Sequence, residues 1–339
     1  MKPKAFAALA VATVACLALA ITTYAAQNRW AQAAVSGTAV FPTLAAQAGN
    51  VAKVELKQGD SAITLARDKE GWTLADRANY PAKAEAVRAL IVKLAQAELV
   101  EAKTRNKDRY ALLELEEPGG KDAKSRQLRL LDDKGAVLAD AVIGKRRYDA
   151  FGSNRSGTYV RKPGDAQTWL SNADLDLTVA VKSWVNPAVL DLAAAKIGKL
   201  IVEVPGEEPL TIERDPTDKS KYTIAAIPDG KKLKAGAGPD SIVRAAGNIE
   251  MEDVRKAVGA PGTDAGTVKL EGDGGLAVTL KLRKDGEDSW VSLEASGSDG
   301  DAKKTADEVN ARAKGWEFKI PAHKAQSILK KRDELFEAS

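Results

Sequence analysis

Two segments of the chain, residues 51–75 and 197–225, follow one pattern of alternating apolar and polar residues, and this internal repeat constrains the fold more than any other feature. Alternation with period two, interrupted by turn residues, indicates a meander of three antiparallel strands in each segment. The strands also match in detail: Leu65–Asp68 with Ile212–Asp215, and Trp72–Leu74 with Tyr222–Ile224. We therefore expect both copies to form the same supersecondary unit.

Each meander is followed by the pattern of an amphipathic helix. The apolar stripes at three- and four-residue spacing are Val87, Leu90, Ile91, Leu94 and Leu99 within 82–102, and Ile242, Val243, Ile249 and Val254 within 239–257. A helix with one apolar stripe needs a sheet to cover. Hairpin patterns with glycine-rich turns then follow at 125–145 and 267–296.

These patterns predict an α+β fold of two tandem related units, residues 51–190 and 197–336. Each unit would be an antiparallel sheet, built from a meander plus hairpins, with helices packed on one face. A chain of 339 residues is long enough for two domains that each bury a core.

The end of each unit carries a further match. The matching segments are Gly157–Pro163 with Gly315–Pro321, and Ala166–Leu170 with Ala325–Leu329. We expect a strand at 158–161, a turn at 162–165 and a following strand. A feature present in both halves is interpreted as structural.

The N-terminal segment has an uncharged run at residues 5–26, preceded by Lys2 and Lys4. A helix of this length extends about 33 Å, enough for a hydrocarbon core of about 30 Å. We interpret residues 1–26 as a signal anchor, a transmembrane helix of a single-pass inner-membrane protein whose C-terminal bulk lies in the periplasm. The alternatives are a cleaved signal peptide, with secretion to the periplasm, and lipidation at Cys16.

Residues 27–50 have the small and polar character of a tether. An apolar plug, Phe41–Leu44, interrupts the tether, and we expect it to dock onto the first unit.

The composition offers little material for catalysis. The chain has one histidine, His323, and one cysteine, Cys16, and it lacks a P-loop and a strand-linked GxGxxG motif. Without Lys2 and Lys4 the net charge falls from +4 to +2, which argues against a nucleic-acid partner. We expect a protein that is not an enzyme and has neither a cofactor nor a metal site.

Several motifs resemble the bacterial domain of unknown function 4340 family. They are FPTL at 41, the run 72–83, EAKT at 101, IGKRR at 143, GTYVRKPGDAQTWL at 157 and Trp184–Asn186. The resemblance implies an envelope protein, often encoded beside ABC-type export permeases and gliding-type auxiliary proteins, with no established catalytic residues. The expected function is a non-catalytic, membrane-anchored accessory of an ABC-type export system that binds the transporter, such as its permease or an auxiliary subunit, or the cargo.

One basic loop is the candidate binding site. Its residues are Lys145, Arg146, Arg147, Arg155, Arg161 and Lys162. Arginine binds phosphate and carboxylate groups bidentately, which favours an anionic ligand. The alternative function is therefore an autonomous module for anionic lipid or glycan. A solvated hairpin whose charges prevent edge-to-edge aggregation explains the same residues.

Overall fold

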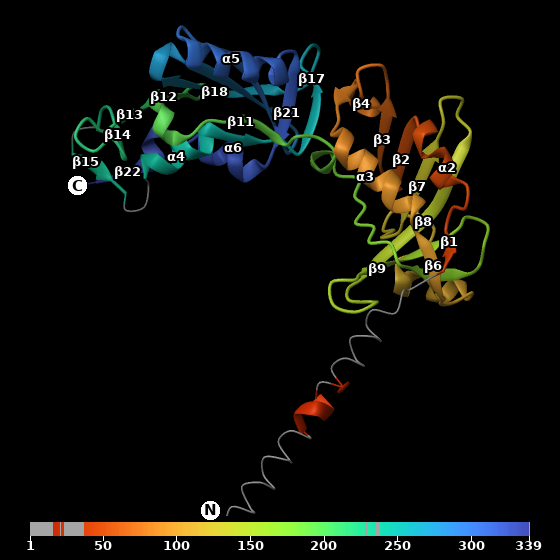
Figure 1. Ribbon diagram of the computed structural model, residues 1–339. Helices are drawn as coiled ribbons and strands as arrows, with labels where there is room; N and C mark the ends of the chain where they lie inside the picture. The colour runs from red at the N-terminus through yellow and green to blue at the C-terminus, as the bar shows by residue number, and fades with distance from the viewer. Residues whose placement is uncertain (1–15, 21, 24–36, 228–229, 235–237, 339) are drawn as a thin grey trace, which may run out of the picture. The chain divides into compact units, whose positions relative to one another are not determined.

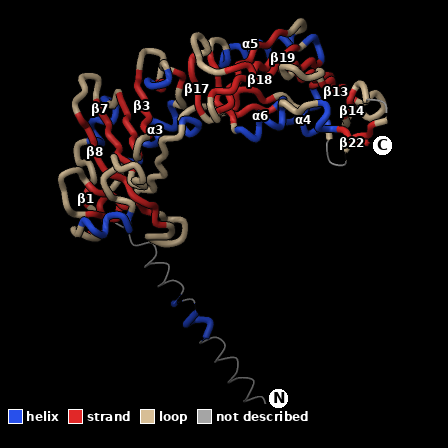
Figure 2. The backbone as a smooth tube through the Cα atoms, turned by 180° about the vertical axis from the view of Figure 1, so that it is seen from behind, coloured by secondary structure: helices blue, strands red, loops and turns tan. Residues whose placement is uncertain are grey.

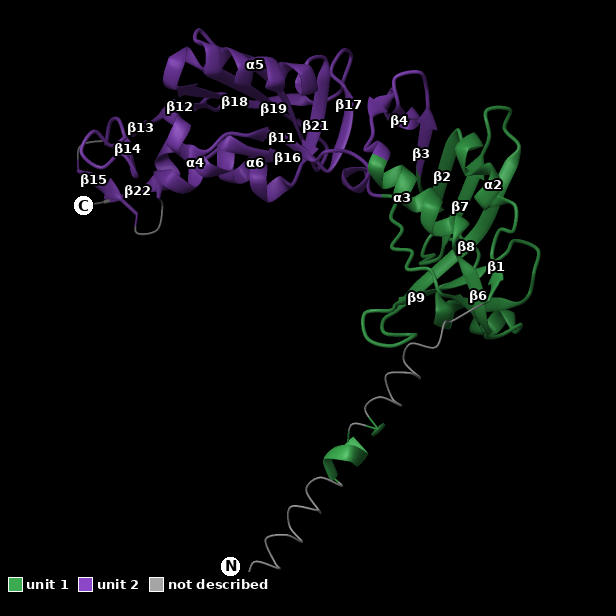
Figure 3. Ribbon diagram, viewed as in Figure 1, with its two compact units in different colours: residues 1–62, 85–179 green, residues 63–84, 180–339 purple. Residues whose placement is uncertain are grey.

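A computed structural model describes residues 16–20, 22–23, 37–227, 230–234 and 238–338 (Figure 1). The chain divides into two compact units, residues 1–62 with 85–179, and residues 63–84 with 180–339 (Figure 3). The boundaries expected from the repeat, 51–190 and 197–336, stay a prediction. Strands outnumber helices throughout the described part (Figure 2).

The first sheet has ten strands in the order β1-β6-β10-β9-β8-β7-β2-β3-β4-β5. It contains the predicted meander at β2, β3 and β4 and the predicted β9–β10 hairpin, with antiparallel pairing of Thr168 to Arg161. The strands are β1 (Thr38–Ala39), β2 (Lys53–Gln58), β3 (Ser61–Arg67), β4 (Trp72–Leu74), β5 (Tyr80–Pro81), β6 (Glu98–Ala102), β7 (Arg126–Leu131), β8 (Val137–Arg147), β9 (Gly157–Arg161) and β10 (Thr168–Ser171).

The second sheet has eight strands in the order β14-β13-β12-β18-β19-β20-β21-β17, and two strand pairs, β11–β16 and β15–β22, accompany it. The strands are β11 (Ala188–Asp191), β12 (Ile197–Glu203), β13 (Leu210–Arg214), β14 (Tyr222–Ile224), β15 (Lys231–Leu233), β16 (Asn248–Glu250), β17 (Asp253–Lys256), β18 (Thr263–Gly272), β19 (Ala277–Asp285), β20 (Asp288–Ser296), β21 (Trp316–Ile320) and β22 (Phe336–Ala338).

The two sheets share one strand order, as expected for two copies of one unit. Without β1 and β5, the first sheet runs β4-β3-β2-β7-β8-β9-β10-β6, and each strand has its counterpart at the same place in the second sheet. The register agrees as well, because Arg67 pairs with Trp72 and Arg214 pairs with Tyr222. After each of these arginines an aspartate accepts backbone N–H groups of the following turn.

The predicted match at the end of each unit is wrong. By its place in the sheet, β9 corresponds to β20, whereas the matched segment Gly315–Pro321 forms β21. The segment Ala325–Leu329 forms the end of a helix, Ala322–Ile328, whereas the segment matched to it, Ala166–Leu170, leads into strand β10. A shared glycine–aromatic–proline pattern cannot distinguish neighbouring strands of a meander, because neighbouring strands have the same period.

The helices are shorter than their stripes predict. α3 (Ala84–Ala95) buries Val87, Leu90, Ile91 and Leu94, and α4 (Pro239–Gly247) buries Ile242 and Val243. Leu99, Ile249 and Val254 instead lie in β6, β16 and β17. In both copies the helix ends before these residues, and the chain continues in strands that pair with other strands. The remaining helices are α2 (Leu44–Gln47), α5 (Gly300–Ala313) and α6 (Ala322–Ile328).

The predicted fold class needs one correction, in its transmembrane helix. No helix in the described part of the chain is long and apolar enough to cross a membrane. Most of the run 5–26 lies outside the described residues, which include only 16–20 and 22–23 of it. The sheet-rich α+β architecture itself is compatible with the prediction.

The apolar plug docks as predicted. Val40, Phe41 and Leu44 are at most 9% exposed, and the Val40 N–H donates to the carbonyl of Ala97. The plug contributes to the core of the first unit.

Candidate binding site

The two faces of the second sheet differ in chemistry. One face of the central strands is apolar, with Leu200, Leu270 and Val278 in register and at most 1% exposed. The opposite face carries charges that pair across strands. The ion pairs are Lys199–Glu213 at 3.4 Å, Lys269–Glu203 at 2.7 Å and Lys319–Asp288 at 2.7 Å.

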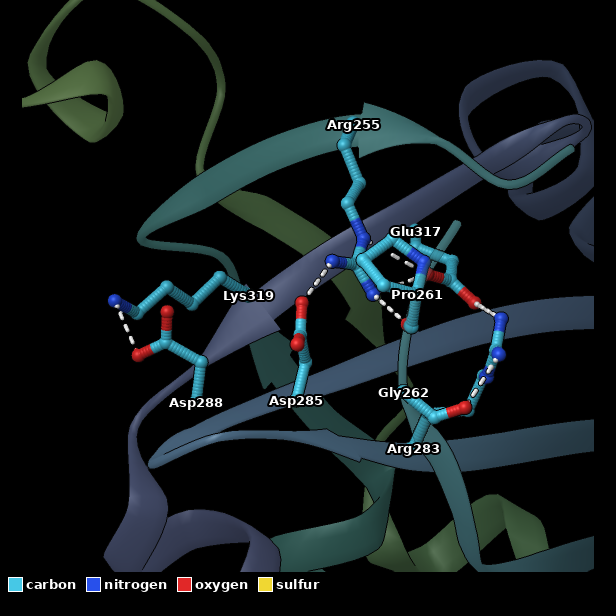
Figure 4. Close-up of polar contacts among 8 residues, drawn as sticks. All are labelled: Arg255, Pro261, Gly262, Arg283, Asp285, Asp288, Glu317 and Lys319. Atoms are coloured by element: carbon cyan, nitrogen blue, oxygen red, sulfur yellow. Dashed lines mark hydrogen bonds and ion pairs between the residues drawn. The ribbon is translucent and has the colours of Figure 1, made fainter. Parts of the chain in front are cut away.

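A buried ion-pair network lies on this polar face near its outer strands (Figure 4). Glu317 of β21 is 3% exposed, and its Oε2 accepts a hydrogen bond from Arg255 Nε at 3.0 Å. Arg283 Nη1 donates to Glu317 Oε1 at 3.3 Å. Arg255 also donates to Asp285 at 2.7 Å. Because β17, β19, β20 and β21 are adjacent strands, their register brings these four side chains together.

The loop between β17 and β18 closes the network. Arg255 Nη2 and Arg283 Nη2 donate to the carbonyl oxygens of Pro261 and Gly262, each at 2.8 Å. Gly262 has φ +115°, and a Cβ there would lie 2.8 Å from the Lys284 carbonyl oxygen, so this loop requires glycine. The carboxylate and the guanidinium groups thus satisfy one another and the loop, which is the arrangement of a structural element.

Trp290 supports the network from the sheet. The Arg255 guanidinium carbon lies 3.9 Å from the centroid of its ring, a cation–π contact. The indole is 8% exposed, and its Nε1 makes no hydrogen bond within the described residues.

A groove of about 750 Å³ opens beside this network, where β20 and β21 separate. β21 pairs with residues 289–291 of β20 but not with its C-terminal half, and α5 lies along that half. The floor includes Thr279, Lys281, Ser292 and Glu294 from β19 and β20, which share the polar face. The walls come from Asp307 and Asn310 of α5, from Lys314, from Trp316 and from Ala257.

Asn310 closes the free edge of β20 beneath the groove. The Ala295 N–H donates to Asn310 Oδ1 at 2.9 Å, and Asn310 Nδ2 donates to the Ala295 carbonyl at 2.8 Å. Helix α5, which carries this asparagine, connects β20 to β21, whereas the equivalent β9–β10 connection is the predicted short turn at 162–165. The groove is therefore built where the two copies differ.

The family model described as a domain of unknown function, DUF4340, matches residues 72–271, more than half of the chain. The chain belongs to the DUF4340 family. No curated protein and no solved structure matches this DUF4340 protein. Except for Ala257, the residues that line the groove follow the matched region.

The structure of the DUF4340 protein distributes the six predicted basic residues over different environments. Arg161 is 5% exposed and points inward, where it donates to the Leu115 carbonyl at 3.3 Å and to Glu117 at 2.8 Å. Arg146 forms an ion pair with Asp174, and the hydrogen bond that Arg146 donates to this carboxylate raises the pKa of Arg146. Both arginines hold the first unit together.

The other four basic residues lie nearer to solvent. Lys145 and Arg147 are exposed at the end of β8 and precede the loop that begins with Tyr148, whose side chain is 70% exposed. Arg155 is also exposed. Lys162 is half-buried beside the apolar plug, in a cavity of about 390 Å³ that Phe41 and Pro42 also line.

Sequence reasoning missed the groove of the DUF4340 protein. Its charged residues belong to three elements, β19, β20 and α5, or follow α5, and they are individually ordinary surface residues. The one available signal was the long insertion between β20 and β21, which is visible only once the two copies are aligned correctly. Within the described residues no group of three His, Cys, Asp or Glu side chains is placed to hold a metal ion.

Proposed function

We propose that this DUF4340 protein is a non-catalytic accessory of an ABC-type export system, which acts on the periplasmic side of the inner membrane and binds the transporter or its cargo. The resemblance of its motifs to envelope proteins of this family supports the setting. The observation that carries the binding role is the groove, an open polar site added to one copy of a repeated scaffold. The neighbouring charges of Glu317, Arg255, Arg283 and Asp285 satisfy one another, which suits a structural role.

Site-specific photocrosslinking in cells tests the accessory role. A photoreactive amino acid in place of Glu294 or Lys314, both exposed at the groove, should yield a crosslinked complex with a permease or auxiliary subunit. The same amino acid at Glu271, exposed on β18 outside the groove, is the control. Equal labelling at all three positions, or no complex with a transport component at any site on the protein, would contradict the proposal.

A second candidate function is binding to anionic lipid through the exposed part of the basic loop. The Tyr148 side chain is 70% exposed, and the exposed Lys145 and Arg147 precede it at the end of β8. An aromatic side chain with adjacent cations suits the interface of an anionic bilayer. This smaller set of residues, without Arg146 and Arg161, is the part that favours the proposal.

Liposome co-sedimentation tests the lipid proposal. The double variant Lys145→Ala and Arg147→Ala should lose binding to phosphatidylglycerol vesicles, and binding by the unaltered protein should weaken with salt. The matched control removes Lys121 and Lys134, two exposed lysines on other turns. If both double variants lose binding equally, the loop has no special role.

A further inference from the structure

We propose that the groove beside α5 is a binding site for a neutral oligosaccharide of about three sugar units. The inference concerns the groove that carries the proposed function and rests on that binding role, because it names the class of ligand that the groove takes. A cavity of about 750 Å³ lies within the range of about 300–1,000 Å³ that is typical of small-molecule sites.

The charged groups that line the groove have no side-chain partner in the described part of the chain. Lys281, Glu294, Asp307 and Lys314 are exposed, and none of them forms a side-chain ion pair or hydrogen bond within the described residues. Along the same face the neighbouring charges are paired, as Lys269–Glu203 at 2.7 Å shows. The groove therefore presents donors and acceptors that remain available to a ligand.

The balance of the lining favours a ligand without net charge. Two ammonium groups and two carboxylates cancel, so an anion or a cation would meet a repelling group beside each attracting one. Thr279 and Ser292 add hydroxyl groups to the floor. The ammonium groups of the lining donate hydrogen bonds, the carboxylates accept them, and the hydroxyl groups do either. This set matches the vicinal hydroxyls of a sugar, because each sugar hydroxyl can donate and accept.

The lining does not suit a lipid. Its aliphatic members are alanines and Leu293, which is 3% exposed, so no large aliphatic side chain is presented to a ligand. Trp316 is half-buried at the wall, and Lys256 Nζ lies 3.5 Å from the centroid of its ring. The aromatic contribution to the lining is thus one half-buried indole ring.

The groove is also closed to an extended peptide at Ala295. A peptide that adds a strand needs the backbone N–H and carbonyl of the edge strand. At Ala295 both groups are already bonded to the Asn310 side chain, at 2.9 and 2.8 Å. A peptide would have to break these two bonds before it formed its own, whereas a sugar that contacts the side chains above them would not.

Isothermal titration calorimetry on the purified full-length chain tests the site. The probes are chitotriose, cellotriose, maltotriose and mannotriose, which are neutral and differ in linkage and stereochemistry. We expect at least one of them to bind, and Glu294→Gln and Asp307→Asn each to weaken that binding about tenfold or more, since each removes a charge-assisted hydrogen bond. Both positions are exposed, and neither side chain has a partner among the described residues, so the variants should fold.

Glu271→Gln is the matched control, because Glu271 is exposed on β18 but does not line the groove. This variant should bind the trisaccharide with the same affinity as the unaltered protein. No binding of any of the four trisaccharides in the millimolar range would overturn the proposal. Binding that survives both groove substitutions would place the site elsewhere. Binding of an alanine–serine tetrapeptide at the groove, in place of the sugars, would overturn the ligand class. None of these outcomes changes the crosslinking result expected for the accessory role.

Discussion

Replacing Glu317 with glutamine tests whether the buried network holds the outer strands of the second sheet together. Glutamine keeps the shape but removes the negative charge, and it turns one acceptor oxygen into an amino group that faces a guanidinium. Glu317 is 3% exposed, and removing one partner of a buried ion pair typically costs about 3–5 kcal/mol. We expect a loss of about 3 kcal/mol, at the lower end, because Asp285 still binds Arg255 and Arg283 is 31% exposed.

Urea unfolding followed by circular dichroism measures this loss. At about 2–4 °C per kcal/mol, the same variant should melt about 6–12 °C lower. Hydrogen exchange should accelerate in β17 and β21, because the network joins these strands through Arg255 and Glu317. The control is Asp288→Asn, which removes a partly exposed ion pair to Lys319 and should cost about 0–1 kcal/mol. If Glu317→Gln costs no more than this control, the network does not stabilise the fold.

Three further predictions concern other positions. Burial raises the pKa of Tyr80 to about 12, whereas a tyrosine in the unfolded chain ionises near pH 10. The free energy of unfolding should therefore fall as the pH rises from about 10 to 12. The variant Tyr80→Phe should abolish this part of the fall, measured as the urea midpoint at each pH. Arg161→Met should lower the free energy of unfolding by about 2–3 kcal/mol in thermal unfolding, because it leaves the Leu115 carbonyl without its donor and Glu117 without its cation. A loss below about 0.5 kcal/mol would contradict a stabilising role for the buried Arg161 side chain. Asn310→Ala should cost about 1–2 kcal/mol and speed hydrogen exchange at residues 292–296, and unchanged exchange there would show that the asparagine does not seal the edge.

The local elements were predictable where one period dominates the pattern. The meander 51–75 alternates between apolar and polar residues and forms β2, β3 and β4, and the stripe from Val87 to Leu94 forms α3. Leu99 continues that stripe by spacing alone, but it lies in β6, where it pairs with Thr38 and Ser171. An apolar residue at a helix-compatible spacing is also compatible with a strand, so only the pairing partner decides.

The candidate sites show the same limit for side chains. The basic loop was visible because its cations are close in sequence, yet the fold uses Arg146 and Arg161 as internal partners of Asp174 and Glu117. The groove was invisible because Lys281, Glu294 and Asp307 are far apart in sequence and become neighbours only through sheet register and the packing of α5.

The sequence by itself determined the alternation of the meander at 51–75, the helix from Val87 to Leu94, the docking plug and the family, because each depends on residue periodicity or local motifs. Only the tertiary structure decided which strands correspond between the copies, which charges are buried in pairs and where a polar groove remains open. Those properties depend on contacts between distant segments, and an ion pair or a cavity exists only where the fold brings its members within a few ångströms. Helix α5 illustrates the second case, since the groove that it lines exists only where this helix packs against β20.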